Sequence, residues 1–150
     1  MNRLFRRLRT AVSARGRARR ERGSATVFML GFAAVLLVGA GLVVDGGLAL
    51  NARSRLTDDA EQAARAGANA IDVAALRDRG ELVVDSGQAT SVASNFLAGR
   101  GYTNIDVRVN GNRVTVSADG KVDTAILGLV GINSFPVHGT AVAEPETGIG

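Results

Sequence analysis

The chain has 150 residues, enough for one small domain with an appended segment, and it has no cysteine, no tryptophan and one histidine. This composition excludes thiol catalysis, disulfide scaffolds and Cys/His zinc sites, while 46% hydrophobic residues make the chain too apolar to be wholly disordered. The net charge of +4 is unevenly divided, because residues 1–22 hold nine arginines and one glutamate and the rest of the chain is net acidic.

An apolar run follows this basic arm: residues 23–44 contain no charged side chain. About 20 helical residues cross the hydrocarbon core of a bilayer. The run is apolar on all sides, whereas a core helix of a soluble protein shows a polar face. We therefore predict a transmembrane helix over residues 23–44. A cleaved signal peptide is the alternative, and it fits less well because neither Asp45-Gly46-Gly47 nor Leu50-Asn51-Ala52 makes a small-x-small cleavage site.

The arginines of the arm predict the orientation of this span. Basic residues close to a span favour the cytoplasmic side, so we expect a single-pass protein of the cell membrane with its N-terminus cytoplasmic and its C-terminal domain extracytoplasmic. The arginines nearest the span carry this prediction: Arg15, Arg17, Arg19, Arg20 and Arg22. The cluster also suits the phosphates of nucleic acid or of anionic lipid. Beside a span, however, the topological role explains it fully, so the lipid bilayer is the expected partner and nucleic acid is disfavoured.

Residues 45–72 are predicted to form an alanine-rich helix outside the membrane. Asp45-Gly46-Gly47 is the only weak joint before it, so span and helix are expected to form one nearly continuous rod that the glycines can bend. Small side chains recur three and four positions apart and make a narrow stripe that permits close packing. The members of this stripe are Leu56, Ala60, Ala63, Gly67 and Ile71. It can pack on a partner in an oligomer or on the chain's own domain, and the sequence leaves both open.

Three features occur in order along residues 22–71: Arg22-Gly23-Ser24-Ala25 before the span, Val44-Asp45-Gly46-Gly47 at its end, and RLTDDAEQAARAGA over residues 55–68. In this combination the region resembles the TadE/TadG-like Flp pilus-assembly family, whose pattern after the span is close to RLQNAADAAALAGA. The residues assigned to the family motif are Gly23, Asp45, Gly46, Arg55, Leu56, Ala60, Ala63, Ala64, Ala66, Gly67 and Ala68. The positions that depart from the pattern are Thr57, Asp58, Asp59, Gln62 and Arg65. The resemblance implies other pilus-assembly or pilin-like subunits as partners and leaves room for a homo-oligomer.

The junction Gly23-Ser24 resembles a prepilin-type cleavage site, because pilin-like subunits are cut after a glycine that follows a basic leader. In pilins, and in many TadE-like proteins, a glutamate stands five residues after the cut. Here that position is Phe28, and no acidic residue occurs between Ser24 and Val44. The chain therefore looks more like the TadG-related branch. We expect it to keep its arginine-rich arm and to remain a membrane-anchored assembly factor, not a major pilin.

The remainder is predicted to be a linker over residues 73–87, a small domain over residues 88–145 and a tail over residues 146–150. Helical spacing predicts a helix at 88–97, and two alternating runs joined at Asn110-Gly111 predict a β-hairpin. A third alternating run, 135–143, contains Pro136, which suggests an edge strand. The type of the apolar segment 125–130 stays open. The predicted class is α+β and pilin-like overall: a transmembrane helix continuing into a long helix, then one helix and an antiparallel sheet.

No catalytic, cofactor or metal site is expected. Asp58, Asp59 and Glu61 are the densest acidic group, but consecutive helical positions diverge by about 100°, so we expect them to be solvated. His138 lacks a Cys, Ser or second His partner in any recognisable motif, which favours a histidine at the rim of a strand. We therefore predict a non-enzymatic structural or assembly component of a Flp (Tad) type pilus or related secretion system, acting through helix and domain packing with partner subunits.

Two alternatives belong to other functional classes. One is a membrane-anchored extracytoplasmic binding module. It is mildly disfavoured, because carbohydrate sites use exposed Trp or Tyr and this chain offers only Tyr102. The other is a membrane-tethered nucleic-acid binder acting through the arginine-rich arm.

Overall fold

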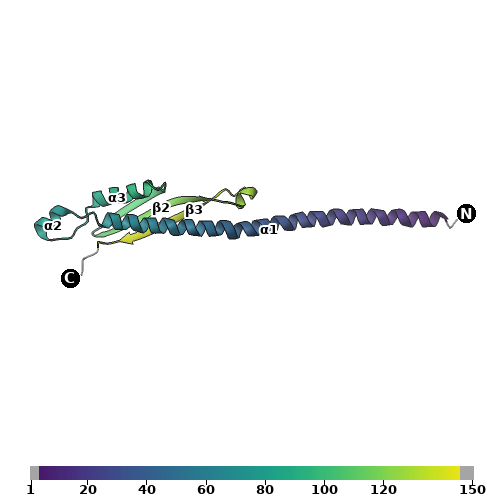
Figure 1. The fold of residues 1–150 in the computed structure, drawn as a ribbon, viewed down its shortest axis with the longest axis horizontal. Coiled ribbons are helices and arrows are strands. Elements are labelled where there is room, and N and C mark those ends of the chain that lie inside the picture. Colours follow the sequence, from purple (N-terminus) through teal and green to yellow (C-terminus); the bar gives the residue numbers. More distant parts are fainter. Residues whose placement is uncertain (1–3, 146–150) are drawn as a thin grey trace.

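One long helix is the axis of the molecule. The computed structural model describes residues 4–145, with side chains from residue 24 onward. Helix α1 (Leu4–Ala68) includes both the apolar run and the alanine-rich segment, and it is helical through Asp45-Gly46-Gly47. Figure 1 shows the N-terminal half of α1 projecting alone and its C-terminal half lying along the sheet. The nearly continuous rod expected from the sequence is therefore present.

A small α+β domain covers the C-terminal half of α1. Its elements are α2 (Val73–Arg79), α3 (Ser86–Ala98), β1 (Thr103–Asn110), β2 (Arg113–Asp123), the short 3₁₀-helix η1 (Leu127–Val130) and β3 (Ser134–Ala143). The sheet is antiparallel with the order β1-β2-β3, so β3 is an edge strand, as Pro136 predicted. The α+β class and the three-stranded sheet predicted from the sequence are confirmed.

Two local features differ from the sequence-based expectation. The segment 73–87, expected to be a linker, contains α2. The carboxylate of Asp72 caps this helix by accepting hydrogen bonds from the backbone N–H groups of Ala74 and Ala75. Helix α3 begins two residues before the predicted start because Asp85 accepts a hydrogen bond from the N–H of Gln88 at 2.9 Å. The open segment 125–130 contains η1, at the tip of the β2–β3 hairpin.

The core lies between one face of the sheet and the helices α1 and α3. Most of the predicted small-residue stripe is in this core: Leu56, Ala60, Ala63 and Gly67 are buried, and Ile71 is half-buried. Gly67 shows how close the packing is, since an added Cβ would lie 3.2 Å from the carbonyl oxygen of Ala89. Of the two partners left open for this stripe, the chain's own domain is the one that it contacts. The buried residues facing it are Ala89, Ala93, Leu97, Val114, Val116, Ala118 and Ala141.

The apolar run of α1 is exposed along almost its whole length. Phe28 and Val43, near its two ends, are 75% and 77% exposed. Within the described residues, this is the one helix long and apolar enough to cross a membrane. A helix in the core of a soluble domain would be mostly buried. The exposure of this run therefore agrees with the predicted span.

Candidate functional site

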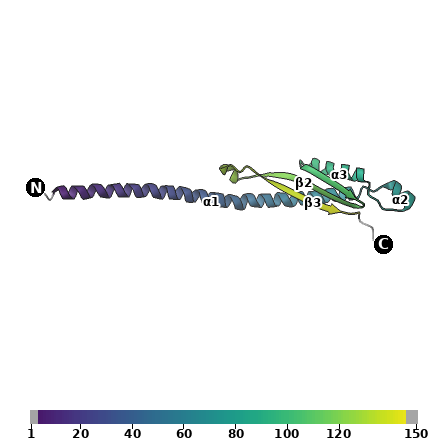
Figure 2. The ribbon, with the colours of Figure 1, turned by 180° about the vertical axis from the view of Figure 1, so that it is seen from behind.

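The candidate site is the place where the apolar run meets the domain. We call it the junction and define it as residues 41–53 of α1 together with residues 124–138 of the β2–β3 hairpin. Figures 1 and 2 show the hairpin folded back so that its tip lies beside α1 and points toward the N-terminus. The far end of the domain carries α2 and the described C-terminus. The junction is thus the part of the domain nearest to the predicted membrane.

Asp45 joins the helix to the hairpin tip. Its side chain is buried, and its two carboxylate oxygens accept hydrogen bonds from the backbone N–H groups of Ala125 at 2.6 Å, Ile126 at 3.1 Å and Leu127 at 2.7 Å. These groups open the turn of η1, whose own N-cap residue makes no side-chain hydrogen bond. The carboxylate therefore caps η1 from another element and also complements the partial positive charge of the N–H groups there.

Gly41 makes the second contact of the tip with α1. A Cβ added to this glycine would lie 2.8 Å from Cδ2 of Leu127 and 3.1 Å from Cγ2 of Ile126. A side chain at position 41 would thus require the side chains of Leu127 and Ile126 to shift. Asp45 lies one helical turn further along α1, so the two residues share a face of the helix. Together they fix the height of the tip along α1.

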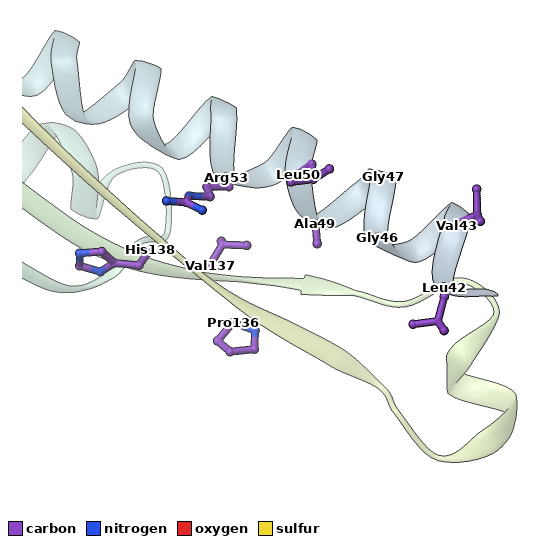
Figure 3. Close-up of a pocket in the computed structure, with 10 residues that line it drawn as sticks. All are labelled: Leu42, Val43, Gly46, Gly47, Ala49, Leu50, Arg53, Pro136, Val137 and His138. Atoms are coloured by element: carbon purple, nitrogen blue, oxygen red, sulfur yellow. The ribbon is translucent and has the colours of Figure 1, made fainter. Parts of the chain in front are cut away.

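A groove runs beside this contact between α1 and β3. Its volume is about 780 Å³, and Figure 3 shows Arg53 and His138 at one end and Leu42 and Val43 at the other. The remaining lining residues are Gly46, Gly47, Ala49, Leu50, Pro136 and Val137. The groove is therefore mainly apolar. Its two polar side chains, Arg53 and His138, lie at the end away from the apolar run.

The glycines of the groove are not required by the packing of the chain itself. A Cβ added to Gly46 or Gly47 would meet no atom within 4 Å. Both lie inside a helix, where glycine is less favourable than alanine by about 1 kcal/mol. A small-residue surface of this kind allows another helix to approach closely.

The predicted site residues lie in several different environments along α1. Leu56, Ala60, Ala63, Ala64, Gly67 and Ala68 of the family motif are buried in the core, and Ala66 is half-buried. Asp45 and Gly46 lie at the junction, while Arg55 is exposed on α1. Ser24 is exposed at the start of the apolar run. Gly23 and the topology arginines Arg15, Arg17, Arg19, Arg20 and Arg22 lie outside the residues whose side chains are described.

A polar cluster that the sequence did not indicate lies further along α1. Asp59, predicted to be solvated, is largely covered: its carboxylate accepts a hydrogen bond from the hydroxyl of Tyr102 at 2.7 Å and pairs with Arg100 at 3.0 Å. Burial, followed by the hydrogen bond to Asp59 and its negative charge, raises the pKa of Tyr102 to about 12. The cluster ties α1 to the loop between α3 and β1. Because Asp59 and Tyr102 are 43 positions apart, no local spacing could have revealed it.

His138 is exposed on β3, as predicted for a rim histidine. Its Nδ1 lies 2.7 Å from a carboxylate oxygen of Asp119, and its Nε2 lies 3.1 Å from the hydroxyl of Thr140. The hydrogen bonds from His138 and Asn104 hold the pKa of Asp119 below its ordinary value. Among residues 24–145, no group of three or more His, Asp or Glu side chains is placed to hold a metal ion. The polar contacts described here join β3 to β2 and join α1 to the hairpin tip and to the loop before β1.

One comparison with known proteins gives a match. Residues 23–70 match a family model described as "Putative Flp pilus-assembly TadE/G-like". The matched region contains the apolar run, Asp45 and the core-facing small residues, and it stops before α2. No curated protein and no solved structure matches the chain. The resemblance predicted from the sequence is confirmed over residues 23–70, which are similar to the TadE/TadG-like Flp pilus-assembly family, and it relates this part of the chain to Flp pilus assembly.

Proposed function

We propose that the protein is a non-enzymatic, membrane-anchored assembly component of a Flp (Tad) type pilus or related secretion system. The observation that carries the proposal is the continuity of α1, whose exposed apolar run leads directly into the family-matched segment that supports the domain. Because span and support are one helix, a subunit that contacts the domain is held at a fixed place relative to the membrane.

The anchor is proposed to be residues 23–44, with the arm in the cytoplasm. The exposed apolar side chains of α1 are suited to lipid, because contact of so much apolar surface with water is unfavourable. The topology arginines oppose transfer of the arm across the membrane. This orientation places the sheet domain and the groove on the extracytoplasmic side.

The groove is the proposed surface for partner subunits. It is apolar over most of its length, it adjoins the span, and Gly46 and Gly47 leave room for a second helix. The small-residue stripe facing the sheet is already occupied by the chain's own domain, so the groove is the better candidate on α1. A helix of another pilus-assembly subunit, continuing out of the same membrane, is the occupant that fits this position.

Site-specific photocrosslinking in native membranes tests the proposal. A photoreactive amino acid is introduced at Leu50, which is 70% exposed in the groove, and in a matched control at Val73, which is 64% exposed on α2 at the far end of the domain. We expect adducts from position 50 with a pilin-like or pilus-assembly subunit encoded with this protein, and none from position 73. In parallel, deletion of the gene should abolish Flp pili on the cell surface, and the wild-type gene should restore them.

Two results would contradict the proposal. One is the absence of adducts from position 50 in cells whose pili are restored by that same variant. The other is a deletion strain with normal pili and normal secretion.

A further inference from the structure

The tip of the β2–β3 hairpin has an unusual composition for an exposed turn. Residues 124–137 contain no charged side chain, and the segment 125–132 reads AILGLVGI. Leu129, Val130 and Ile132 are exposed at 75%, 49% and 45%. Turns in water are rich in polar residues, and adjacent exposed apolar side chains mark a contact surface. The tip therefore needs an apolar environment that the described part of the chain does not supply.

The position of the tip along α1 indicates what that environment is. Leu127 and Ile126 contact Gly41, which lies inside the uncharged run of α1. Gly41 is four residues from Asp45 on the side of the span, which corresponds to about 6 Å along the helix axis. Apolar groups at a membrane surface reach about 5–10 Å into the boundary between headgroups and acyl chains. The tip thus lies at the level where the outer end of the span enters the bilayer.

The backbone of the tip is also suited to a medium with little water. A polar group without a partner is costly in such a medium, so its hydrogen bonds must be made within the protein. The N–H groups of residues 125–127 bind the carboxylate of Asp45. Leu129 and Ile132 donate to the carbonyl oxygens of Ile126 and Leu127, each at 3.0 Å. Tight internal pairing combined with outward apolar side chains is typical of a segment that contacts lipid.

We propose that the hairpin tip, residues 125–132, inserts into the outer leaflet beside the span as a second membrane contact. The proposal rests on the membrane anchoring proposed above. Insertion at two places fixes both the height and the tilt of the domain, because a single helix can tilt freely and a helix with a lateral contact cannot. Asp45 then has a specific role as a positioning residue, since its carboxylate holds the tip at the depth of the lipid boundary.

Depth-dependent fluorescence quenching tests this inference on the full chain. The chain has no native cysteine, so one introduced cysteine carries the only fluorophore. The protein is reconstituted in vesicles of phosphatidylcholine and phosphatidylglycerol, with and without lipids that carry a nitroxide on the acyl chain. The test position is Leu129→Cys, with Val130→Cys as a second tip variant. Thr140→Cys on the same β3 strand is the aqueous control, and Val35→Cys in the apolar run is the membrane control.

We expect the fluorophore at positions 129 and 130 to emit at shorter wavelength than at position 140 and to lose intensity with nitroxides placed near the headgroups. The fluorophore at position 35 should be quenched best by deeper nitroxides, and position 140 should not be quenched. If position 35 is quenched but both tip positions behave like position 140, the tip does not insert into the bilayer. The proposed transmembrane span would still be supported by that result. If position 35 is not quenched either, the anchor itself is wrong. Shielding of the tip that disappears when protein is diluted in lipid would show that a second copy covers it, and this result would also overturn the inference.

Discussion

Asp45 connects two parts of the chain that are 80 positions apart. Both of its oxygens are used as acceptors, and every donor is a backbone N–H of the hairpin tip. A carboxylate is well suited to this role because it has no donor of its own and accepts several hydrogen bonds at once. The residue that looked like the polar end of a span is thus the attachment point of the domain nearest to the membrane.

The substitution Asp45→Asn should release the tip. The amide keeps one acceptor oxygen but places an NH₂ group opposite backbone donors, so at least one N–H loses its partner. We expect the amides of Ile126 and Leu127 to exchange with solvent about tenfold faster or more, the size typical of a lost hydrogen bond to a charged group. Hydrogen exchange with mass spectrometry measures this change. Asp58→Asn, at an exposed position of the same helix, is the control, and equal exchange in both variants would contradict the assigned role of Asp45.

The ionisation of Tyr102 can be followed by its absorbance and reports on the polar cluster on α1, because Tyr102 is the single tyrosine of a chain without tryptophan. Burial and the neighbouring Asp59 carboxylate raise its pKa from 10.0 to about 12. A raised pKa favours the neutral phenol, so the cluster contributes its full stability below pH 10.0 and loses it as the pH rises through about 12. Absorbance at the phenolate band should therefore titrate with a midpoint near 12.

Asp59→Asn should lower that midpoint toward the ordinary value, because it removes the negative charge while keeping a hydrogen-bond acceptor. Asp58→Asn should leave it unchanged. A wild-type midpoint near 10.0 would show that Tyr102 and Asp59 do not make the described contact.

At the scale of elements, the sheet packs closely on α1 through small residues. Gly139 on β3 is the clearest case: an added Cβ would lie 2.8 Å from Cγ of Leu56 and 3.2 Å from the backbone nitrogen of Thr57. Backbone atoms in the middle of a helix cannot move aside cheaply. The absence of a side chain at position 139 therefore sets the distance between strand and helix.

We expect Gly139→Ala to destabilise the domain by about 1–3 kcal/mol through overpacking. Gly47→Ala is the matched control, since its Cβ meets no atom within 4 Å and alanine is favoured in a helix by about 1 kcal/mol. Thermal unfolding of the full chain in detergent should thus show a lower midpoint for Gly139→Ala and an equal or higher midpoint for Gly47→Ala. Equal midpoints for wild type and Gly139→Ala would mean that β3 packs less closely than described.

The elements that sequence reasoning predicted are those with a local sequence signal of their own. The alanine-rich helix, α3 and the Asn110-Gly111 hairpin have periodic spacing, the apolar run has length and uniform apolarity, and each is present. Helix α2 has only seven residues, too few to show a period, and it depends on the Asp72 cap. The functions of Asp45 and Asp59 were missed for a different reason: their partners are distant in sequence, and only the fold brings them together. Spacing rules apply within one element and carry no information about such pairs.

At the scale of the whole molecule, the proposed anchor and the segment on which the domain packs are parts of one continuous helix. The domain contacts α1 from Gly41 onward, so the proposed span, residues 23–44, overlaps this contact at its outer end. Because no loop separates them, the position of the proposed span in the bilayer would also determine where the groove lies. This arrangement suits a protein that presents a surface to neighbouring subunits at a defined height.

Processing of the arm is the first prediction at this scale. Cleavage after Gly23 would remove the arginines that are proposed to hold the N-terminus in the cytoplasm, and Phe28 provides no carboxylate to pair with a new terminal amine. We therefore expect protein purified from native membranes to keep residues 1–23. Measurement of the intact mass tests whether these residues are retained. A terminus at Ser24, together with recovery of the protein in sheared filaments, would contradict the prediction.

The central claim is that α1 crosses the membrane with the arm inside and the domain outside. The accessibility of introduced cysteines tests this claim most directly. The two positions are Ser13 in the arginine-rich arm and Ser91, exposed on α3, each changed to cysteine in the naturally cysteine-free chain. A membrane-impermeant maleimide applied to intact spheroplasts should label Ser91→Cys and should label Ser13→Cys only after the membrane is permeabilised. Labelling of Ser13→Cys in intact spheroplasts, or labelling of Ser91→Cys only after permeabilisation, would contradict the account.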